Sequence, residues 1–360
     1  MNTDERLKRL RKVILSKDLD GMLVSAESNV SYISGFTGDS SLLVVTSAKQ
    51  YFITDFRYVE QAASECPGWT VVRRGKDGLW KTAAAAMAEG GVRKLGFESG
   101  HLTHAGHAKL AEAAEGVTLT PLADVVETLR AVKTPEEIER IEEALRTQES
   151  ALREVLAWIR PGITEKRVAA ELDCRMRLGG AERPAFETIV ATAERASLPH
   201  ARPTERVISQ GDAVLVDWGA TCFFYNSDLT RVVHFGTVSR EFRAVYDIVR
   251  SAQERALAVI RPGVTFSEVD GAARGFIAER GHGESFGHAL GHGVGLEVHE
   301  SPVVREGNTE RLQPGMVFTV EPGIYIPGWG GVRIEDMVLV TDDGVRVLSD
   351  FERDLDKLTL

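Results

Sequence analysis

Four β-rich, apolar segments in the C-terminal half of the chain each carry a carboxylate at a strand end or beside a glycine. The acids are Asp217, Asp228, Glu321 and Glu335. An acid that ends an apolar strand is expected to be buried, and a buried carboxylate must be paired or bound to a cation. The segment between Asp217 and Asp228 could form a hairpin that brings both acids together. One such acid alone could cap a turn or pair with an arginine, but four predict strands that converge on one site.

A stretch rich in histidine and glycine lies among these segments. Residues 288–302 read HALGHGVGLEVHESP and contain His288, His292 and His299. Packing alone does not readily explain this pattern, because glycine lets the backbone pass close to a bulky group. We predict that this stretch forms the floor of an active site, with His292 beside the four acids.

A metal centre is the simplest way to hold these side chains together, because like charges in one cavity would otherwise raise each other's pKa. Four carboxylates exceed the need of one divalent ion, so two ions fit better. Oxygen-rich ligation with one imidazole favours Mn²⁺, with Co²⁺, Fe²⁺ or Zn²⁺ as alternatives. The lack of a nearby cysteine argues against a structural zinc site.

Length and composition restrict the class of protein. A chain of 360 residues suggests two domains, and 43% hydrophobic with 27% charged residues is typical of a soluble globular protein. The net charge of -10 argues against nucleic acid or an anionic membrane as a partner. Three scattered cysteines suit a reducing compartment. The charged start of the chain and the lack of an apolar run of about 20 residues predict a cytoplasmic location.

The N-terminal part alternates between helix and strand patterns. A helix is predicted after Thr3, and further helices near residues 58–66, 81–90 and 105–115; strands are predicted at 21–25, 41–46, 51–54 and 94–98. This alternation indicates a small α/β domain. Thr134 and Pro135 then form a strong helix start. We place the domains at residues 1–127 and 128–360.

The C-terminal part contains a weak internal repeat. Ile260-Arg-Pro-Gly-Val-Thr265 is similar to Ile159-Arg-Pro-Gly-Ile-Thr164, and each lies between two helical patterns. The spacing of about one hundred residues suggests two similar halves within this domain.

Several segments of the sequence resemble the motifs of a known family. Asp217–Arg231, His288–Pro302, Val320–Gly323 and Gly331–Asp336 resemble the motifs of M24 metallopeptidases with the pita-bread fold. The N-terminal motifs at residues 32–38 and 54–58 resemble those of Xaa-Pro peptidases, aminopeptidase P and prolidase. The resemblance implies an α/β (α+β) protein with a pita-bread catalytic domain after a smaller creatinase/prolidase-type domain. It implies a homodimer that hydrolyses peptides with proline at the second position.

The resemblance also implies a role for each metal-binding position. Asp217 would bind one ion, His292 and Glu321 the other, and Asp228 and Glu335 would bridge the two. The glycines around His292 are then interpreted as room for a peptide.

Further positions match catalytic residues. His200, His288 and His299 match histidines that face the substrate, and Arg333 matches an arginine that supports the ligands. Glu321 would also receive the proton of the attacking water, and His288 or His299 would donate a hydrogen bond to the oxyanion.

Two positions depart from the family pattern, because Ala193 and Phe224 stand where the family usually has glycine. Either change could narrow the substrate pocket, and Phe186 and Phe224 are candidate walls for a proline ring. For a dipeptidase, Arg305 or Arg311 could bind the substrate's C-terminal carboxylate.

Other functions remain open from the sequence. A pita-bread protein that has lost its ligands can act as a peptide-binding module, and a creatinase-like hydrolase works without metals. The filled ligand positions disfavour both. A methionine aminopeptidase would not explain the N-terminal domain. The sequence does not separate dipeptidase from aminopeptidase action.

Overall fold

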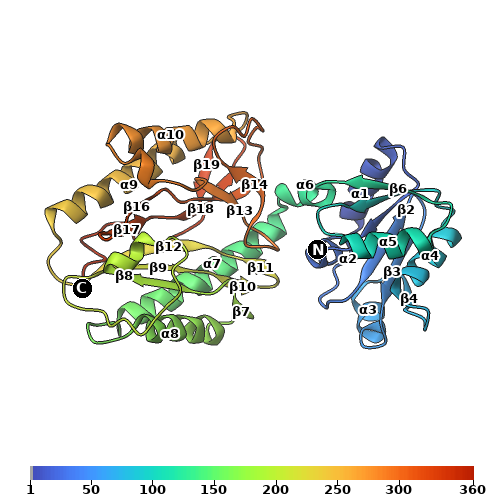
Figure 1. Cartoon of the computed structure of the whole chain (residues 1–360), viewed down its shortest axis with the longest axis horizontal. Coiled ribbons are helices and arrows are strands. Elements are labelled where there is room, and N and C mark those ends of the chain that lie inside the picture. Colours follow the sequence, from blue (N-terminus) through green and yellow to red (C-terminus); the bar gives the residue numbers. More distant parts are fainter. Residues whose placement is uncertain (1–2) are drawn as a thin grey trace. The chain divides into compact units, whose positions relative to one another are not determined.

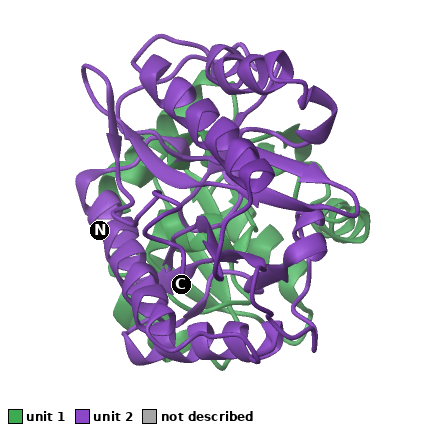
Figure 2. Cartoon of the chain, turned by 90° about the vertical axis from the view of Figure 1, so that its left-hand side faces the viewer, with its two compact units in different colours: residues 1–130 green, residues 131–360 purple. Residues whose placement is uncertain are grey.

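The computed structural model describes residues 3–360. The chain forms two compact units, Met1–Arg130 and Ala131–Leu360, which Figure 2 colours separately. Each unit has its own hydrophobic clusters. The predicted boundary between residues 127 and 128 falls inside a helix, α6, and stays a prediction.

The first unit is built on a mixed six-stranded sheet with the order β4-β3-β2-β1-β5-β6 (Figure 1). Central β1 is buried along its whole length and pairs antiparallel with β2 and parallel with β5. The strands are β1 (Gly21–Val24), β2 (Leu42–Thr46), β3 (Gln50–Thr54), β4 (Thr70–Arg73), β5 (Lys94–Glu98) and β6 (Thr118–Leu122). The helices are α1 (Thr3–Ser16), α2 (Glu27–Ser34), α3 (Val59–Glu65), α4 (Leu79–Glu89), α5 (His104–Ala113) and α6 (Val125–Ala131).

The predicted elements of this unit are confirmed, and four were missed. Two of the missed elements, β4 and β6, are the edge strands of the sheet and have no run of buried residues. An edge strand has a neighbour on one side only, so its sequence lacks the apolar run that marks a central strand. The other two, α2 and α6, are short helices of 8 and 7 residues, and α2 ends at Gly35 in the left-handed conformation.

The second unit has helices outside several small sheets (Figure 1). Its sheets have the orders β11-β10-β7, β12-β9-β8, β14-β13-β15-β18-β19 and β16-β17. The helices are α7 (Pro135–Leu156), α8 (Glu165–Leu178), α9 (Arg240–Val259) and α10 (Phe266–Glu279), with short 3₁₀ turns η1 (Ala193–Ser197) and η2 (Gly283–Ser285). The strands are β7 (Arg183–Pro184), β8 (Ile189–Thr192), β9 (Ala213–Trp218), β10 (Ala220–Cys222), β11 (Tyr225–Asn226), β12 (Leu229–His234), β13 (Gly291–Gly293), β14 (Glu300–Val304), β15 (Val317–Val320), β16 (Gly323–Ile326), β17 (Gly330–Arg333), β18 (Asp336–Val340) and β19 (Val345–Val347).

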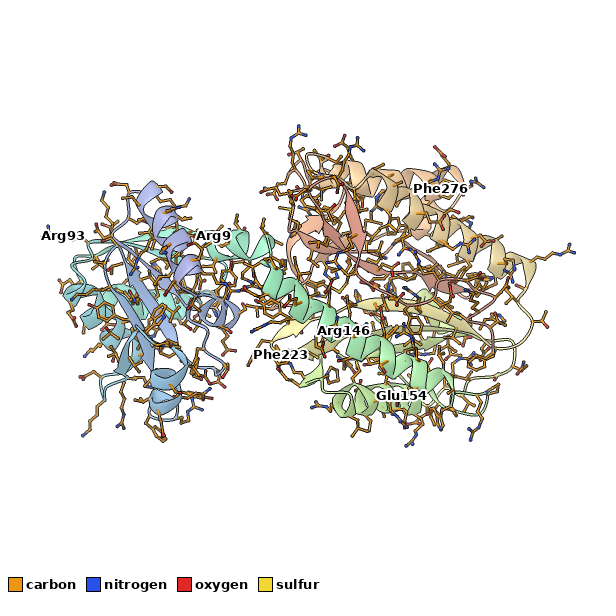
Figure 3. The ribbon with its side chains drawn as sticks, turned by 180° about the vertical axis from the view of Figure 1, so that it is seen from behind. Arg9, Arg93, Arg146, Glu154, Phe223 and Phe276 are labelled. Atoms are coloured by element: carbon orange, nitrogen blue, oxygen red, sulfur yellow. The ribbon has the colours of Figure 1, made fainter. Side chains whose placement is uncertain are left out.

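The long helix α7 begins as predicted. Thr134 accepts a hydrogen bond from the Glu137 amide, and the Glu137 side chain accepts one from the Thr134 amide, so the two form a capping box. Arg146 and Glu154 lie on the exposed side of the helix (Figure 3). The opposite side, including Leu152, is buried in the core.

The internal repeat is confirmed by matching local geometry. Thr164 caps α8 and Thr265 caps α10, each by accepting a hydrogen bond from the third helical residue. Gly162 and Gly263 both have positive φ angles, of 98° and 87°. Their amides donate to Ile208 and Leu312 respectively. The two halves therefore make the same turn between paired helices.

Strands β9 and β12 lie between the cores of the two halves. Along β9, Val214 and Val216 belong to the cluster with α7 and α8, whereas Leu215 belongs to the cluster with α9 and α10. Side chains alternate between the faces of a strand, so Asp217 points to the same side as Leu215. Burial on both faces explains why β9 is continuously apolar up to this acid. Within residues 3–360, no helix is long and apolar enough to cross a membrane.

Candidate metal centre

A cavity of about 560 Å³ opens in the second unit, on the inner side of β9. Its lining combines apolar side chains such as Phe186 and Ile189 with a dense group of acids and histidines. All nine positions predicted as metal ligands or catalytic residues line it: His200, Asp217, Asp228, His288, His292, His299, Glu321, Arg333 and Glu335.

Strand pairing explains how distant acids meet. β9 and β12 pair antiparallel, with Asp217 opposite Thr230, so the predicted hairpin is confirmed and Asp228 lies near its partner acid. β15 and β18 also pair antiparallel, with Val320 opposite Asp336. Glu321 and Glu335 follow and precede this pair, so they emerge side by side from the ends of two neighbouring strands.

His292 lies on β13 within reach of three of these acids. Its Nε2 is 3.3 Å from Glu321 Oε1 and 3.6 Å from Asp228 Oδ2. Asp228, His292 and Glu335 offer ligand atoms that lie within 4.8 Å of one another. The His292 amide donates to the Thr319 hydroxyl, which in turn donates to Glu321 Oε1. The strand backbone therefore fixes the imidazole and Glu321 together.

The protonation preferences in this cluster reflect burial and crowded negative charge. Burial, together with the neighbouring carboxylates, raises the pKa of Asp228 and of Glu335 well above the usual range. Burial also raises the pKa of Asp217, although Arg333 opposes it. Burial would raise the pKa of Glu321 too, but His292, His288 and Arg333 outweigh it and lower this pKa to about 2. The chain itself supplies too little positive charge for all four acids to ionise.

The donor set fits a cation. Asp217 Oδ1 and Glu335 Oε1 are buried and receive no hydrogen bond from the part of the chain that the structure describes. A buried carboxylate oxygen without a donor is costly, and a metal ion would compensate it. Oxygen atoms with one imidazole are ligands that divalent ions such as Mn²⁺ accept.

Arg333 connects the centre to its surroundings. Its guanidinium donates to Asp217 Oδ2 at 2.5 Å, to the Thr230 hydroxyl at 3.0 Å and to the Tyr325 hydroxyl at 2.8 Å. Thr230 in turn donates to Glu335 Oε2 at 2.7 Å. The buried arginine thus holds one oxygen of Asp217 and, through Thr230, one oxygen of Glu335, and leaves the other oxygen of each acid unpaired.

His288 is engaged by the protein at both ring nitrogens. Its Nδ1 lies 2.7 Å from the Ala289 carbonyl oxygen and its Nε2 lies 2.9 Å from the Tyr325 hydroxyl. A carbonyl accepts only, so the Nδ1 carries the proton and the Nε2 accepts from Tyr325. Burial lowers the pKa of His288 and raises the pKa of Tyr325 to about 12, so both are neutral. The ring of His299, by contrast, meets that of His292 edge to face, with ring centroids 4.2 Å apart.

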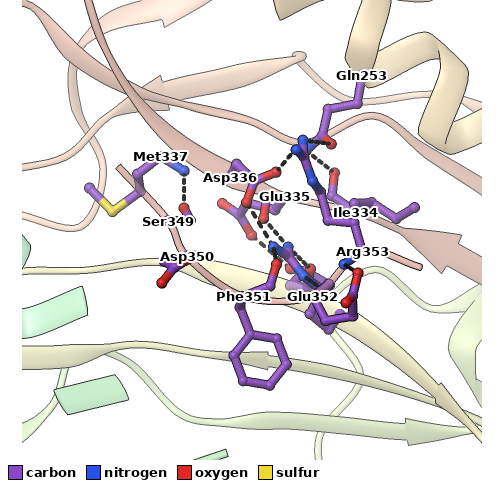
Figure 4. A network of polar contacts seen from close by, with 12 residues as sticks. Gln253, Ile334, Glu335, Asp336, Met337, Ser349, Asp350, Phe351, Glu352 and Arg353 are labelled. Carbon is purple, nitrogen blue, oxygen red and sulfur yellow. Dashed lines mark hydrogen bonds and ion pairs between the residues drawn. The ribbon is translucent and has the colours of Figure 1, made fainter. Parts of the chain in front are cut away.

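A buried network behind the centre positions the strands that carry Glu321 and Glu335 (Figure 4). Gln253, on α9, donates to the carbonyl oxygens of Val320 and Ile334. Arg353 donates to both Gln253 Oε1 and Asp336 Oδ2. Arg231, fully buried, pairs with Asp336 at 2.7 Å and donates to the Glu335 carbonyl.

The structure corrects three interpretations of the sequence. The glycines near His292 do not make room for a peptide: a Cβ on Gly291 would lie 1.9 Å from the Thr319 carbonyl oxygen, and one on Gly293 2.3 Å from that of Ser301. Phe224 does not line the cavity; with Phe223 it forms the turn between β10 and β11, where Phe223 is exposed (Figure 3). Arg305 and Arg311 do not line the cavity either.

Sequence reasoning missed Tyr325, Thr230 and Gln253. A tyrosine or threonine in an apolar strand has the pattern of a core residue, and a single glutamine on a helix has no distinguishing spacing. Only the tertiary contacts reveal their roles.

Comparison with known proteins identifies the family. The profile described as Metallopeptidase family M24 matches residues 139–342, and that described as Creatinase/Prolidase N-terminal domain matches residues 6–132. The first match alone covers more than half of the chain. The chain belongs to metallopeptidase family M24. The predicted family is therefore confirmed, and membership of a metallopeptidase family implies a divalent metal cofactor.

The similarity to individual M24 proteins extends over the whole chain. A protein from Pyrococcus furiosus named Xaa-Pro dipeptidase is 37% identical over 353 residues, which are 98% of this chain and 99% of that protein. The structure of an Xaa-Pro dipeptidase from Bacillus anthracis matches with a TM-score of 0.96, at 40% identity and with 100% of both chains covered.

An X-Pro aminopeptidase from Thermotoga maritima also matches this M24 chain, with a TM-score of 0.88 and 38% identity over 96% of this chain and 99% of the other. The predicted fold class is confirmed by these matches: a pita-bread C-terminal domain follows a smaller creatinase/prolidase-type α/β domain. Relatives of both activities are similar to this chain to nearly the same degree.

Proposed function

We propose that this M24 protein hydrolyses the peptide bond between an N-terminal residue and proline, as an Xaa-Pro dipeptidase or aminopeptidase. The observation that carries the proposal is the convergence of four carboxylates and one imidazole on one cavity, in which Asp217 Oδ1 and Glu335 Oε1 have no donor among residues 3–360. The names of the relatives from Pyrococcus furiosus, Bacillus anthracis and Thermotoga maritima support the choice of substrate.

The proposed cofactor is a pair of divalent ions, with Mn²⁺ favoured over Co²⁺, Fe²⁺ or Zn²⁺ because the ligands are mainly carboxylates. Asp217 would bind one ion, His292 and Glu321 the other, and Asp228 and Glu335 both. When bound, the ions would polarise the scissile carbonyl and make a water molecule more acidic.

The side chains around the ligands have separate proposed tasks. Glu321 accepts a proton from the attacking water, and His299 donates a hydrogen bond to the oxygen of the scissile carbonyl. His200, exposed at the cavity, contacts the substrate. His288 has its donor nitrogen occupied by Ala289, so its proposed task is to hold Tyr325 against Arg333.

Proline recognition is proposed to depend on shape. A prolyl residue has no N–H to donate, so the site must recognise the ring by apolar contact. Phe186, Ile189, Val298 and Val303 line the cavity and provide such a wall.

The proposal includes a homodimer, as the resemblance to Xaa-Pro peptidases implies, and a cytoplasmic location. Cys66, Cys174 and Cys222 are free thiols, which suits a reducing compartment. The second candidate, a peptide-binding module or creatinase-like hydrolase without metals, is disfavoured because it would not need the retained set of ligands.

The test is metal-dependent turnover. Purified protein is freed of metal with a chelator and assayed on Ala-Pro and Ala-Pro-Ala with and without added Mn²⁺. We expect no turnover of either substrate without metal and recovery with Mn²⁺. A protein with no bound divalent ion and no stimulation by any of the four metals would contradict the proposal.

A further inference from the structure

We propose that Arg202, at the rim of the cavity, binds the free C-terminal carboxylate of the substrate, and that Glu187 holds this arginine when no substrate is present. The inference rests on the proposed function and makes it specific. Substrates that end at the proline would be preferred, so the protein would act mainly as a dipeptidase.

The first observation is an exposed ion pair across the rim. Arg202 and Glu187 both line the cavity, and Arg202 Nε lies 3.3 Å from Glu187 Oε2. Their side chains are 83% and 66% exposed. An exposed ion pair contributes little to stability, so a second carboxylate can replace Glu187 at small cost.

The second observation is that the other arginine of the cavity is already engaged by the protein. Arg333 donates to Asp217, Thr230, Tyr325 and the Pro199 carbonyl. Four of its five N–H donors are therefore committed, and it is buried. Among the described residues that line the cavity there is no lysine.

Arg202 is the opposite case. Its Nε lies 3.3 Å from Glu187 Oε2. Its terminal nitrogens donate no hydrogen bond to the described part of the chain, so they are available to a ligand. A planar guanidinium can bind a carboxylate through two parallel hydrogen bonds, which makes arginine the residue suited to this task.

The backbone of Arg202 is held while its side chain is free. Arg195 donates to the Arg202 carbonyl oxygen at 2.7 Å and pairs with the buried Glu165. Two residues on, the Thr204 amide and hydroxyl donate to the same Glu165 carboxylate, at 2.9 and 2.7 Å. The loop therefore presents Arg202 from a fixed position, which lowers the entropy cost of binding.

The position of the arginine fits the orientation of the substrate. The acids proposed to hold the metal ions lie at the inner end of the cavity, whereas Arg202 lies exposed at the rim. A dipeptide whose scissile bond lies at the ions can therefore direct the carboxylate of its proline outward, to Arg202. In a longer peptide the carboxylate at this position is replaced by a neutral amide.

The experiment compares Ala-Pro with Ala-Pro amide, which differ only in that charge. For the wild-type protein with Mn²⁺ we expect kcat/KM to favour the acid by about tenfold or more, the equivalent of one charge-assisted contact. Arg202→Ala should raise KM for Ala-Pro by about tenfold and change KM for the amide less than about twofold. Arg305→Ala, an arginine outside the cavity, is the matched control and should change neither.

Glu187→Gln tests the competing ion pair. Removal of the carboxylate frees Arg202, so KM for Ala-Pro should fall by about threefold, with kcat unchanged. In the Arg202→Ala background the same substitution should have no such effect, because the competition no longer exists. Both positions are exposed, and circular dichroism of each variant should match that of the wild type.

The outcomes separate this inference from the proposed function. If the wild type cleaves the acid and the amide equally well, or if Arg202→Ala affects both alike, the assignment of Arg202 is wrong while the peptidase function stands. If the wild type with Mn²⁺ cleaves neither substrate nor Ala-Pro-Ala, the proposed function is overturned and the assignment with it.

Discussion

The buried side chain of Gln253 donates a hydrogen bond to the carbonyl oxygen of Ile334 at 3.2 Å. The same nitrogen donates to the carbonyl oxygen of Val320 at 3.1 Å. Ile334 directly precedes Glu335, and Val320 directly precedes Glu321. One amide from α9 therefore sets the spacing between the two strand ends that carry the acids.

Replacement of Gln253 by leucine should weaken metal binding and stability together. Two buried carbonyl groups would lose their donor, at a cost of about 2–3 kcal/mol in the free energy of unfolding. Looser support of the ligands should reduce metal affinity by about tenfold or more. Urea unfolding and calorimetric titration with Mn²⁺ measure the two effects. Glu254 is an exposed neighbour on the same helix, so Glu254→Leu should change stability and metal affinity little. Equal effects from the two variants would contradict the role assigned to Gln253.

Removal of the imidazole at His292 should abolish turnover without unfolding the protein. His292→Ala removes a proposed ligand, so we expect kcat/KM on Ala-Pro to fall by about 10³-fold or more. Metal content measured after dialysis should fall with it, while circular dichroism stays unchanged. His101→Ala, at an exposed site in the first unit, serves as the control. Activity near the wild-type level would show that the ligand assignment is wrong.

A buried ion pair should matter for the position of His299. Lys133 Nζ lies 2.9 Å from Glu300 Oε1, and both side chains are almost fully buried, at 1% and 3% exposure. Lys133→Met would remove the buried cation that faces Glu300, at a cost of about 3–5 kcal/mol in the free energy of unfolding. Because Glu300 directly follows His299, KM for Ala-Pro should also rise.

A double variant distinguishes charge compensation from simple packing. Lys133→Met combined with Glu300→Gln removes both charges and should restore most of the stability that the single variant loses. Lys166→Met, which breaks an exposed pair with Glu205, should change unfolding by less than about 1 kcal/mol. If the double variant is as unstable as Lys133→Met in urea unfolding, the charge argument fails.

Local patterns were enough to predict most elements and the family, but not the contacts that support the site. Asp217 and Glu321 could be identified because each ends an apolar strand, and His292 because it lies in an unusual glycine-rich stretch. Tyr325 and Gln253 act through partners far along the chain, such as Arg333 and Ile334, and their residue types are common in cores. The glycines were misinterpreted because close approach to a protein strand and to a substrate leave the same mark in a sequence.

Stability should depend on pH through His234. This histidine is buried on β12, its Nδ1 has no partner among the described residues, and burial lowers its pKa below the ordinary value of 6.5. The unfolded chain therefore binds a proton more readily than the folded one, so this contribution is present above about pH 6.5 and is lost as the pH falls through the lowered folded-state pKa. His234→Phe, which keeps the ring beside Phe242, should lose less stability between about pH 7.5 and pH 5.5 in urea unfolding. If His234→Phe loses as much stability as the wild type between these two pH values, His234 is not the source of the pH dependence.

Replacement of Ala193 by glycine should stabilise the protein. Its φ of 52° lies in the left-handed region, as does that of Phe224, the other position where the family usually has glycine. A side chain costs about 1–2 kcal/mol in this conformation, partly offset by the greater chain entropy of glycine. Ala193→Gly should therefore raise the free energy of unfolding by about 0.5–1 kcal/mol. Ala244→Gly, at an exposed position inside α9, should lower it by about 1 kcal/mol. Because Ala193 does not line the cavity, kcat and KM on Ala-Pro should stay unchanged. A loss of stability in Ala193→Gly would contradict the strain argument, and a shift in KM would show that this residue shapes the pocket.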